Sequence, residues 1–304
     1  MKIAVTGATG VIGAAAVRSL VAEGHRVVGL ARTPDKASLL ESWGATAQAA
    51  GIFDHSSLVA MFDGCDAVCN FATHIPVGLR AARASAWREN DLLRTEGVRR
   101  VVAAAQEARV RRLVQESVSF LYADQGEDWI DEQSPLDINV ATEPACVGES
   151  HVQAFQSDLR QGVVLRFGLI VGDDAQTRFW LRNARRGRPV GMGSPEGWVH
   201  LVHTDDLGPA VAAALTAPGG TYNLGAEPVR RRDLVRGLGE AAGRDSGAFM
   251  PALLRRALGA RVEPLTRSLR VSSSRFSTGT GWTPRRPVFD PGWLAATRMS
   301  RAGR

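Results

Sequence analysis

The beginning of the chain carries the pattern that most restricts its fold. Lys2–Thr6 reads as a short apolar strand, Val11–Glu23 has helical periodicity, and Arg26–Leu30 reads as a second buried strand. Strand, helix and strand in this order are typical of a βαβ unit, which places two parallel strands beside each other. Three glycines separate the first strand from the helix, namely Gly7, Gly10 and Gly13.

Each of these glycines has a physical role at this spacing. The first allows a tight turn, the second lets a pyrophosphate approach the backbone, and the third lets the helix pack close to the strand. The helix N-terminus then offers free N–H groups and the positive end of its dipole to phosphates. The alternative is a glycine-rich turn that binds no ligand. If the turn binds the pyrophosphate of a dinucleotide cofactor, the residues expected to contact it here are Gly7, Thr9, Gly10, Val11, Ile12 and Gly13.

The end of the second strand distinguishes the two nicotinamide cofactors. An acidic residue there bonds the ribose 2′-hydroxyl, whereas an arginine accommodates a 2′-phosphate. This chain has Arg32 at that point, no acid before Asp35, and Lys36 directly after it. The sequence therefore favours NADP(H) over NAD(H), with Arg32 as the cap of a solvated loop as the alternative interpretation.

The positive charge of the chain does not indicate nucleic-acid binding. The net charge is +6, but of the 37 basic residues only Lys2 and Lys36 are lysines, and the arginines are scattered over the whole length. A nucleic-acid footprint needs basic residues clustered on one face. We therefore expect a small-molecule substrate and no nucleic acid.

Cysteine content and hydropathy restrict the class of protein further. The three cysteines, Cys65, Cys69 and Cys146, are too widely spaced for a metal site or a disulfide framework. No apolar run approaches the roughly 18 residues of a membrane helix. The opening MKIAVTGATG reaches glycine too soon for a signal peptide. We expect a cytoplasmic protein without a membrane or metal site.

The opening TGATGVIG resembles the short-chain dehydrogenase/reductase superfamily, specifically its extended or atypical branch of NAD(P)-dependent epimerase/dehydratase-like proteins. Further segments resemble the family in the same order, so the similarity covers nearly the full length. These segments are GIFDHSSLVAMFDGCDAVCNFA (51–72), NDLLRTEGVRRVVAAAQEARVRRLVQESVSFLYAD (90–124), GVVLRFGLIVG (162–172), WVHLVHTDDL (198–207), TYNLG (221–225) and VSSSRFSTGTGWTP (271–284).

The resemblance implies an α/β fold, a Rossmann-type doubly wound parallel sheet with a smaller C-terminal substrate lobe. Residues 1–172 are expected to form the dinucleotide-binding core, to which residues 198–225 return. Residues 173–197 and 226–304 are expected to form the substrate lobe. Relatives often form homodimers through two long helices, which would be approximately 88–108 and 146–160 here.

The resemblance also assigns residues near the cofactor. Asn70 and Ala72 are expected beside the nicotinamide ribose at the end of the fourth strand. The acidic residue that contacts adenine in the family falls on Ile52, so that hydrogen bond is missing. Asp54 is more readily explained as the N-cap of a helix that begins near His55.

The catalytic positions of the family are changed in this chain. The family uses a serine after the fifth strand and a Tyr-x-x-x-Lys pair on the next helix, where the tyrosine transfers the proton that accompanies hydride transfer. These positions fall on Val118, Cys146 and Ser150. The loss does not depend on the alignment, because neither tyrosine of the chain, Tyr122 or Tyr222, is followed by a lysine four residues later.

Several other residues are candidates for the missing acid. His74 begins the loop that roofs the substrate and has a side chain suited to acid–base chemistry. Glu116 and Ser117 lie at the carboxyl end of the fifth strand, where ligands bind in open α/β sheets. Glu149 shares a helix face with Cys146. Tyr122 is a further candidate, whereas Cys146 itself reads better as a small apolar filler.

Two polar stretches have both a functional and a structural interpretation. Arginines at helical spacing in TRFWLRNARRGRP (177–189) could hold an anionic substrate, but a solvated arginine face over buried aromatics explains them better. His200, His203, Asp205 and Asp206 could bind a metal, but the resemblance implies instead that an aspartate caps the following helix.

Three functions remain open from the sequence. The first is an atypical NADP-dependent oxidoreductase that reduces a small carbonyl or enone-type substrate without the usual tyrosine and lysine. The second is a non-redox isomerase, dehydratase or cyclase on the same fold. The third is a binding protein that senses the redox state of NADP(H).

Overall fold

A seven-stranded parallel sheet forms the centre of the protein, in the order β12-β7-β5-β4-β1-β2-β3. The computed structural model describes residues 1–251 and 259–295. The strand order reverses between β1 and β4, which is the switch point where open α/β sheets bind ligands. The strands are β1 (Lys2–Thr6), β2 (Arg26–Ala31), β3 (Thr46–Ala49), β4 (Ala67–Asn70), β5 (Arg112–Val118), β7 (Gln161–Phe167) and β12 (Gly220–Leu224).

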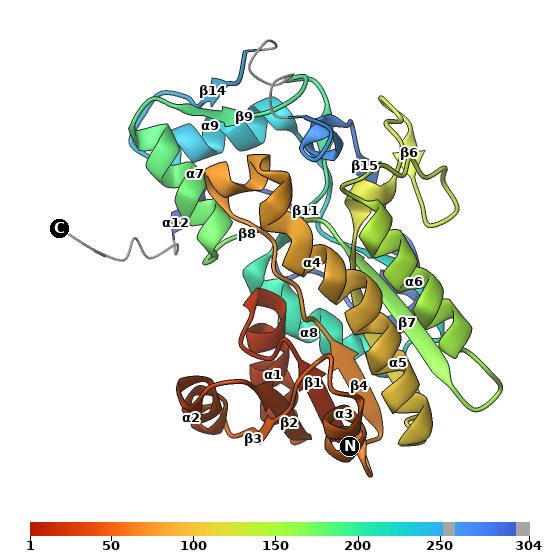
Figure 1. Ribbon diagram of the computed structural model, residues 1–304. Coiled ribbons are helices and arrows are strands. Elements are labelled where there is room, and N and C mark those ends of the chain that lie inside the picture. Colours follow the sequence, from red (N-terminus) through yellow and green to blue (C-terminus); the bar gives the residue numbers. More distant parts are fainter. Residues whose placement is uncertain (252–258, 296–304) are drawn as a thin grey trace.

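Helices cover both faces of this sheet (Figure 1). The helices on one face contribute to the same apolar cluster as Ile3 and Val5, and those on the other face to the same cluster as Ala4. Successive residues of β1 thus point to opposite sides, and both sides are buried, as expected for a parallel strand. The first face carries α1 (Val11–Ala22) and α8 (Thr204–Ala214), and the second carries α3 (His55–Phe62), α5 (Val98–Glu107) and α6 (Glu143–Phe155).

The expected Rossmann-type core is confirmed, including most of the helix and strand positions. The long helix expected near residues 88–108 consists of α4 (Arg88–Leu92), a π-helical turn (Leu93–Gly97) and α5 without a break. The helix expected to reach residue 160 ends at Phe155. The remaining helix at the edge of the core is α2 (Pro34–Ser42).

A second lobe lies above the carboxyl ends of the strands in Figure 1. Its own apolar cluster includes Trp180, Leu234, Leu238 and Trp293. Its elements include α7 (Ala175–Arg185), β9 (Pro189–Gly191), β13 (Val229–Arg230), α9 (Arg231–Ala241), β14 (Ala248–Phe249) and α12 (Gly292–Ala295). Residues 252–258 and 296–304 of the expected lobe lie outside the described residues.

Short strand pairs connect the lobe with the core. β10 (Trp198–Val199) pairs with β13, and β11 (Leu201–His203) pairs with β8 (Leu169–Val171). The chain returns to the core from α8, which packs against α1, and then adds β12 to the sheet beside β7. The last elements are β6 (Trp129–Ile130), its partner β15 (Arg270–Val271) and α11 (Ser274–Thr280). Within the described ranges, no helix is long and apolar enough to cross a membrane.

The turn between β1 and α1 yields a first prediction. A Cβ atom at Gly13 would lie 2.1 Å from the carbonyl oxygen of Gly7, so Gly13→Ala must push α1 away from the sheet. We expect a loss of roughly 1–3 kcal/mol in the free energy of unfolding, measured by urea denaturation. Gly279→Ala is the control, because its Cβ would meet no described atom within 4 Å. Equal stability of the two variants would contradict the close packing at Gly13.

Candidate functional site

The turn after β1 has the form of a phosphate cradle. Gly7 has a φ of +64°, and a Cβ there would lie 2.4 Å from the carbonyl oxygen of Phe71. The N-cap of α1 is Gly10, and no described side chain caps this helix, whereas Thr33 caps α2 and Asp54 caps α3. The first-turn N–H groups of α1 are thus left for an anion, so the turn fits a dinucleotide pyrophosphate.

The other residues of this turn have different exposures. Thr9 is half-buried and Val11 is exposed, whereas the side chain of Ile12 is buried in the core. Ile12 could therefore contact a ligand only through its backbone.

Asp54 accepts a hydrogen bond from the Ser57 amide at 3.3 Å, so its predicted role as a helix cap is confirmed.

Arg32 and Lys36 lie beyond the end of β2, at the beginning of α2. Arg32 is exposed and Lys36 is half-buried, and neither side chain forms an ion pair with another described residue. The backbone amide of Lys36 donates to Thr33 Oγ1 at 3.4 Å as part of the α2 cap. Both cationic groups are therefore available to an anion near the end of β2.

Asn70 lies at the end of β4 and is completely buried. Its Oδ1 accepts hydrogen bonds from the Thr6 hydroxyl and, at 3.4 Å, from the Ala72 amide, while its Nδ2 donates to Gln115 Oε1 at 2.7 Å. Asn70 thus connects the ends of β1 and β4 to the middle of β5, and it fixes the backbone at Ala72. A direct contact between either residue and a ribose stays a prediction.

A buried ion pair occupies the region of the changed catalytic positions. Arg166, on β7, donates from Nε to Glu149 Oε1 at 2.9 Å and from Nη2 to Glu149 Oε2 at 2.6 Å. Ser117, at the end of β5, donates its hydroxyl to the same Oε1 at 2.5 Å. Two of the predicted residues, Ser117 and Glu149, therefore do come together. The side chains of Glu149 and Arg166 are only 4% and 6% exposed, so both charges depend on this pairing.

Tyr122 extends the same network toward the edge of the sheet. Its hydroxyl donates to Asn223 Oδ1 at 2.7 Å and accepts from Arg166 Nη1 at 2.9 Å. Burial raises the pKa of Tyr122 to about 12, although the neighbouring Arg166 acts in the opposite direction. Tyr122 is thus a neutral, fully hydrogen-bonded group that joins β7 to β12.

A second buried ion pair involves Glu116. Arg94, in the π-helical turn, donates to Glu116 Oε1 at 2.6 Å, and both side chains are almost completely buried. Arg94 Nη1 and Glu116 Oε2 have no hydrogen-bond partner among the described residues. The two carboxylates predicted as cleft acids are therefore each held by an arginine that sequence reasoning missed.

The residues that the resemblance places at the family's catalytic positions have no comparable network among the described residues. The Ser150 hydroxyl is exposed and donates to the carbonyl of Cys146 at 3.0 Å within its own helix. Cys146 is half-buried, and burial, followed by the nearby Glu149, raises the pKa of its thiol. Val118 is half-buried at the end of β5.

His74, the other predicted acid, is about half exposed, and its Nδ1 lies 3.6 Å from Glu89 Oε2.

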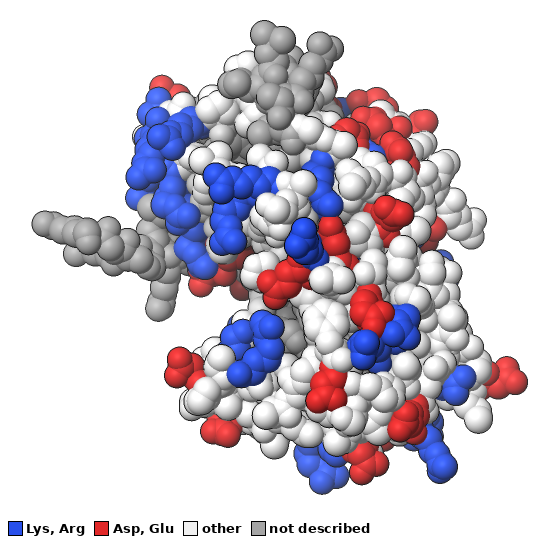
Figure 2. Space-filling model, viewed as in Figure 1, with Lys and Arg blue, Asp and Glu red and all other residues white. Residues whose placement is uncertain are grey.

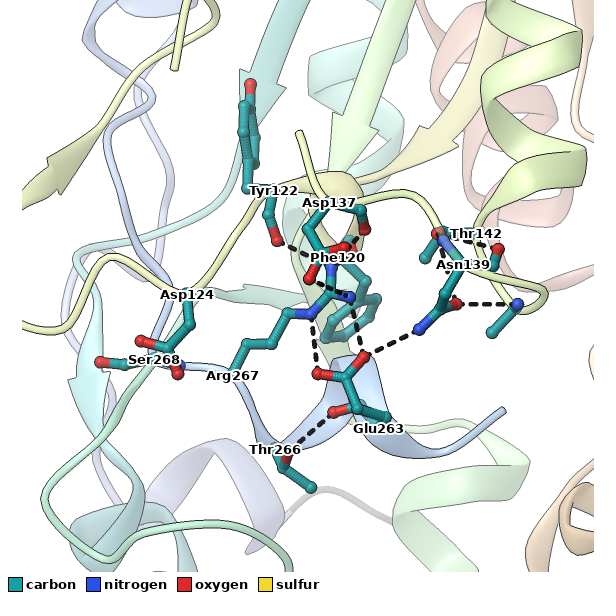
Figure 3. Close-up of polar contacts among 11 residues, drawn as sticks. Phe120, Tyr122, Asp124, Asp137, Asn139, Thr142, Glu263, Thr266, Arg267 and Ser268 are labelled. Carbon is teal, nitrogen blue, oxygen red and sulfur yellow. Dashed lines mark hydrogen bonds and ion pairs between the residues drawn. The ribbon is translucent and has the colours of Figure 1, made fainter. Parts of the chain in front are cut away.

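Arg267 anchors the loop that follows β5 to the second lobe (Figure 3). Its guanidinium donates to the carbonyl oxygens of Phe120, Tyr122 and Asp137 at 3.2, 2.9 and 2.7 Å. It also pairs with Glu263 at 2.7 Å, while its own side chain is 2% exposed. Position 267 therefore fixes the shape of the loop next to the buried Glu149–Arg166 pair.

Of these three arginines, Arg166 has a signal in the sequence. Arg166 lies in the otherwise apolar strand GVVLRFG, and a charge in a buried strand requires a partner. Arg94 and Arg267 have no such pattern around them, and the even scatter of arginine along the chain concealed them.

The expected aspartate cap of α8 is wrong. His203 caps this helix, because its Nδ1 accepts from the Asp205 amide at 3.1 Å. Asp206 instead accepts from the Arg285 amide at 2.6 Å and from that of Arg286 at 3.4 Å, which binds the C-terminal segment to the core. The described residues contain no cluster of histidine, cysteine and acidic side chains that could hold a metal ion.

The arginines of the 177–189 stretch lie mainly on the surface. Trp180 is buried in the lobe, whereas the arginines that follow it are exposed. Figure 2 shows basic side chains gathered on the flank of the second lobe, over the region of α7. This arrangement agrees with a solvated arginine face over buried aromatic residues. The exposed arginines are Arg182, Arg185, Arg186 and Arg188.

Comparison with known proteins identifies the family. Residues 3–225 match the model of the NAD dependent epimerase/dehydratase family. The chain belongs to this family. It is 29% identical, over 96% of its length and 99% of the relative's, to a Streptomyces protein named 3-diazoavenalumate denitrifying reductase.

Solved structures of low sequence identity share the fold. The human epimerase family protein SDR39U1 with NADPH has a TM-score of 0.78 at 23% identity and covers 97% of this chain and 98% of its own. The UDP-glucose 4-epimerase of Thermus thermophilus, in complex with NAD, has a TM-score of 0.76 at 22% identity, with 98% and 97% covered. These similarities confirm the Rossmann-type architecture.

The buried ion pair yields a prediction on stability. Arg166→Met leaves the Glu149 carboxylate buried without its cation, and we expect a loss of roughly 3–5 kcal/mol in the free energy of unfolding by urea denaturation. Removing both charges in Arg166→Met/Glu149→Leu is expected to restore much of this loss. The control is Arg99→Met, which removes an exposed pair with Glu96 and is expected to cost far less. A loss for Arg166→Met as small as for the control would rule out the assigned role of the pair.

Tyr122 yields a prediction on pH dependence. Its pKa in the folded protein, about 12, lies above the ordinary value near 10, so between these values only the unfolded state loses the proton. The contribution of Tyr122 to the free energy of unfolding is therefore constant below pH 10 and falls as the pH rises above it. Urea midpoints measured from neutral to alkaline pH should show a shallower fall in Tyr122→Phe than in the parent. The same slope in both proteins would show that Tyr122 is not held neutral.

Proposed function

We propose that the protein is an NADP(H)-dependent reductase that transfers hydride to a small, electron-poor acceptor without the tyrosine and lysine pair of its relatives. The observation that carries this proposal is the intact phosphate cradle beside a site whose carboxylates are bound by arginines. The full-length Streptomyces relative that is named a reductase supports the reductive direction.

The residues of the chain fit a dinucleotide at three points. The glycine turn and the uncapped first turn of α1 suit the pyrophosphate. Arg32 and Lys36 suit a 2′-phosphate, because both are cationic and without an ion-pair partner among the described residues. Asn70 shapes the backbone at the end of β4. When bound, NADPH supplies the hydride.

The site favours an acceptor that needs no strong acid. A simple ketone that accepts hydride becomes a strongly basic alkoxide, which must gain a proton as it forms. Conjugated enones leave a delocalised enolate, which water can protonate. Cys146 offers little acid catalysis because its thiol pKa is raised, and Tyr122 is a weak acid because its pKa is raised to about 12 and its hydroxyl already donates to Asn223. An enone-type acceptor therefore suits this chain better than an isolated carbonyl.

The buried residues act mainly by positioning. Arg166 holds Glu149 and, through it, the Ser117 hydroxyl at the end of β5. His74 follows β4 in the chain, and its side chain is about half exposed. This arrangement also weakens the case for a non-redox isomerase or dehydratase, since Glu116 and Glu149 are both engaged with arginines rather than free to act as bases.

The test measures NADPH oxidation by the purified protein with benzylideneacetone as acceptor, beside a saturated ketone of similar size. We expect turnover of the enone, a preference for NADPH over NADH, and loss of that preference in Arg32→Glu. Cys146→Ala should change kcat by less than about threefold, because its thiol is not the acid. Arg111→Glu, at an exposed position just before β5, is the charge-matched control for Arg32→Glu. Absence of turnover with a broad enone and quinone panel would overturn the proposal.

A further inference from the structure

Five arginines form an unpaired basic surface on one flank of the second lobe. Four of them lie in the last turn of α7 and in the segment that leads to β9. The fifth lies beside this segment, because a Cβ at Gly187 would be 3.4 Å from Arg244 Nη2. All five are exposed, and none forms an ion pair with another described residue. We call this surface the arginine flank; it consists of Arg182, Arg185, Arg186, Arg188 and Arg244.

Other exposed or half-buried arginines of the lobe do have acidic partners. Arg236 pairs with Asp233 at 2.8 Å, and Arg230 pairs with Glu127 at 2.6 Å. The arginine flank is therefore a local excess of positive charge. Like charges one helical turn apart repel each other, so an anionic partner stabilises this surface.

The loop between β5 and α6 carries the opposite charge. Residues 123–143 contain seven acidic residues and no lysine or arginine. Asp128 and Asp131 are exposed, and neither forms an ion pair with another described residue. In Figure 1, β6 of this loop lies at the upper right and α7 at the upper left, and Figure 2 shows acidic side chains gathered at the upper right. The seven residues are Asp124, Glu127, Asp128, Asp131, Glu132, Asp137 and Glu143.

An exposed indole ring lies between these acidic residues in the chain. Trp129 is 52% exposed whereas Ile130 is buried, so the alternation of a strand directs Trp129 and Asp131 to the same side. The guanidinium of Arg270 lies 4.3 Å from the centroid of the Trp129 ring and 4.7 Å from that of Trp198. Stacking of arginine on tryptophan thus already organises this surface. The exposed part of Trp129 offers the same contact to a further cation.

Exposed apolar side chains belong to the same loop. Leu136 and Ile138 are each 39% exposed and Val140 is 48% exposed. Tryptophan and apolar side chains surrounded by charged ones are typical of the core and rim of a protein interface. We call this surface the acidic face; it consists of Asp128, Trp129, Asp131, Leu136, Ile138 and Val140.

We propose that the arginine flank of one copy of the chain docks on the acidic face of a second copy. Each surface supplies what the other lacks, namely guanidinium groups for Asp128, Asp131 and the ring of Trp129, and carboxylates for the arginines. A nucleic acid would occupy only the arginine flank and leave the acidic face without a partner. The inference does not depend on the proposed reductase function.

The two surfaces differ and lie on opposite sides of the molecule, so the contact is heterologous. Each copy in such a contact still has one free surface of each kind, or closes a ring. The contact therefore repeats from copy to copy and produces species that grow with protein concentration. It also weakens as salt screens the exposed charges.

The experiment is sedimentation velocity of the full chain over a range of protein concentrations, at about 0.05 M and about 0.5 M salt. Two neutral variants each remove one surface, Arg185→Gln/Arg186→Gln and Asp128→Asn/Asp131→Asn. Asparagine at 131 keeps the oxygen that accepts from the Gln133 amide at 2.9 Å, so the turn is preserved. We expect each variant to associate about tenfold more weakly than the parent at low salt, because two exposed ion pairs are lost.

Mixing the two variants makes the test specific to a heterologous contact. One variant keeps the acidic face and the other keeps the arginine flank, so an equimolar mixture is expected to associate although neither variant does so alone. Trp129→Leu is expected to weaken the parent's association about threefold through loss of the cation–π contact. The matched control is Arg26→Gln/Arg111→Gln, which removes two exposed arginines elsewhere and should associate as the parent does.

The outcomes decide between this contact and its alternatives. A parent that does not associate at low salt, or a mixture that stays dissociated, would overturn the proposal. Equal weakening by the control would assign the effect to net charge and overturn it as well. Tighter binding of a short DNA duplex by the parent than by Arg185→Gln/Arg186→Gln, without self-association, would assign the flank to nucleic acid instead. NADPH binding is expected to be the same in all variants, so failure of this contact leaves the proposed function untouched.

Discussion

The ion pair between Glu149 and Arg166 is the interaction on which the centre of this protein depends. It joins α6 to β7 inside the fold, and its partners Ser117 and Tyr122 extend it to β5 and, through Asn223, to β12. An isolated charge at either position would be very unfavourable in this buried environment. The carboxyl ends of three neighbouring strands are therefore held in one arrangement by charged rather than apolar contacts.

This network changes the chemistry available at the carboxyl edge of the sheet. The polar groups at this edge are occupied with one another. The turn after β1, by contrast, leaves the first-turn amides of α1 without a side-chain cap. The described structure thus combines arginine-paired carboxylates at the strand ends with an uncapped helix N-terminus beside β1.

The sequence predicted well those features that depend on neighbouring residues. Gly10, Gly13 and the cap at Asp54 are local, because each acts within a few positions of itself, whereas Gly7 also passes close to the backbone of Phe71. It did not predict the pairing of Arg94 with Glu116 or of Arg166 with Glu149, since nothing in a single sequence states which distant charges meet. The cap of α8 was missed because a histidine side chain can replace an aspartate as acceptor, while Asp206 binds a remote loop.

The anchoring of the loop after β5 has a consequence for how the protein is made. Arg267 bonds the carbonyl of Phe120 across 147 positions, and β15 pairs with β6 at Arg270 and Trp129. Domains form progressively as a nascent chain leaves the ribosome. The residues of the phosphate turn are synthesised long before these late residues appear. The loop after β5 is therefore fastened only by residues that leave the ribosome after every strand of the central sheet has been made.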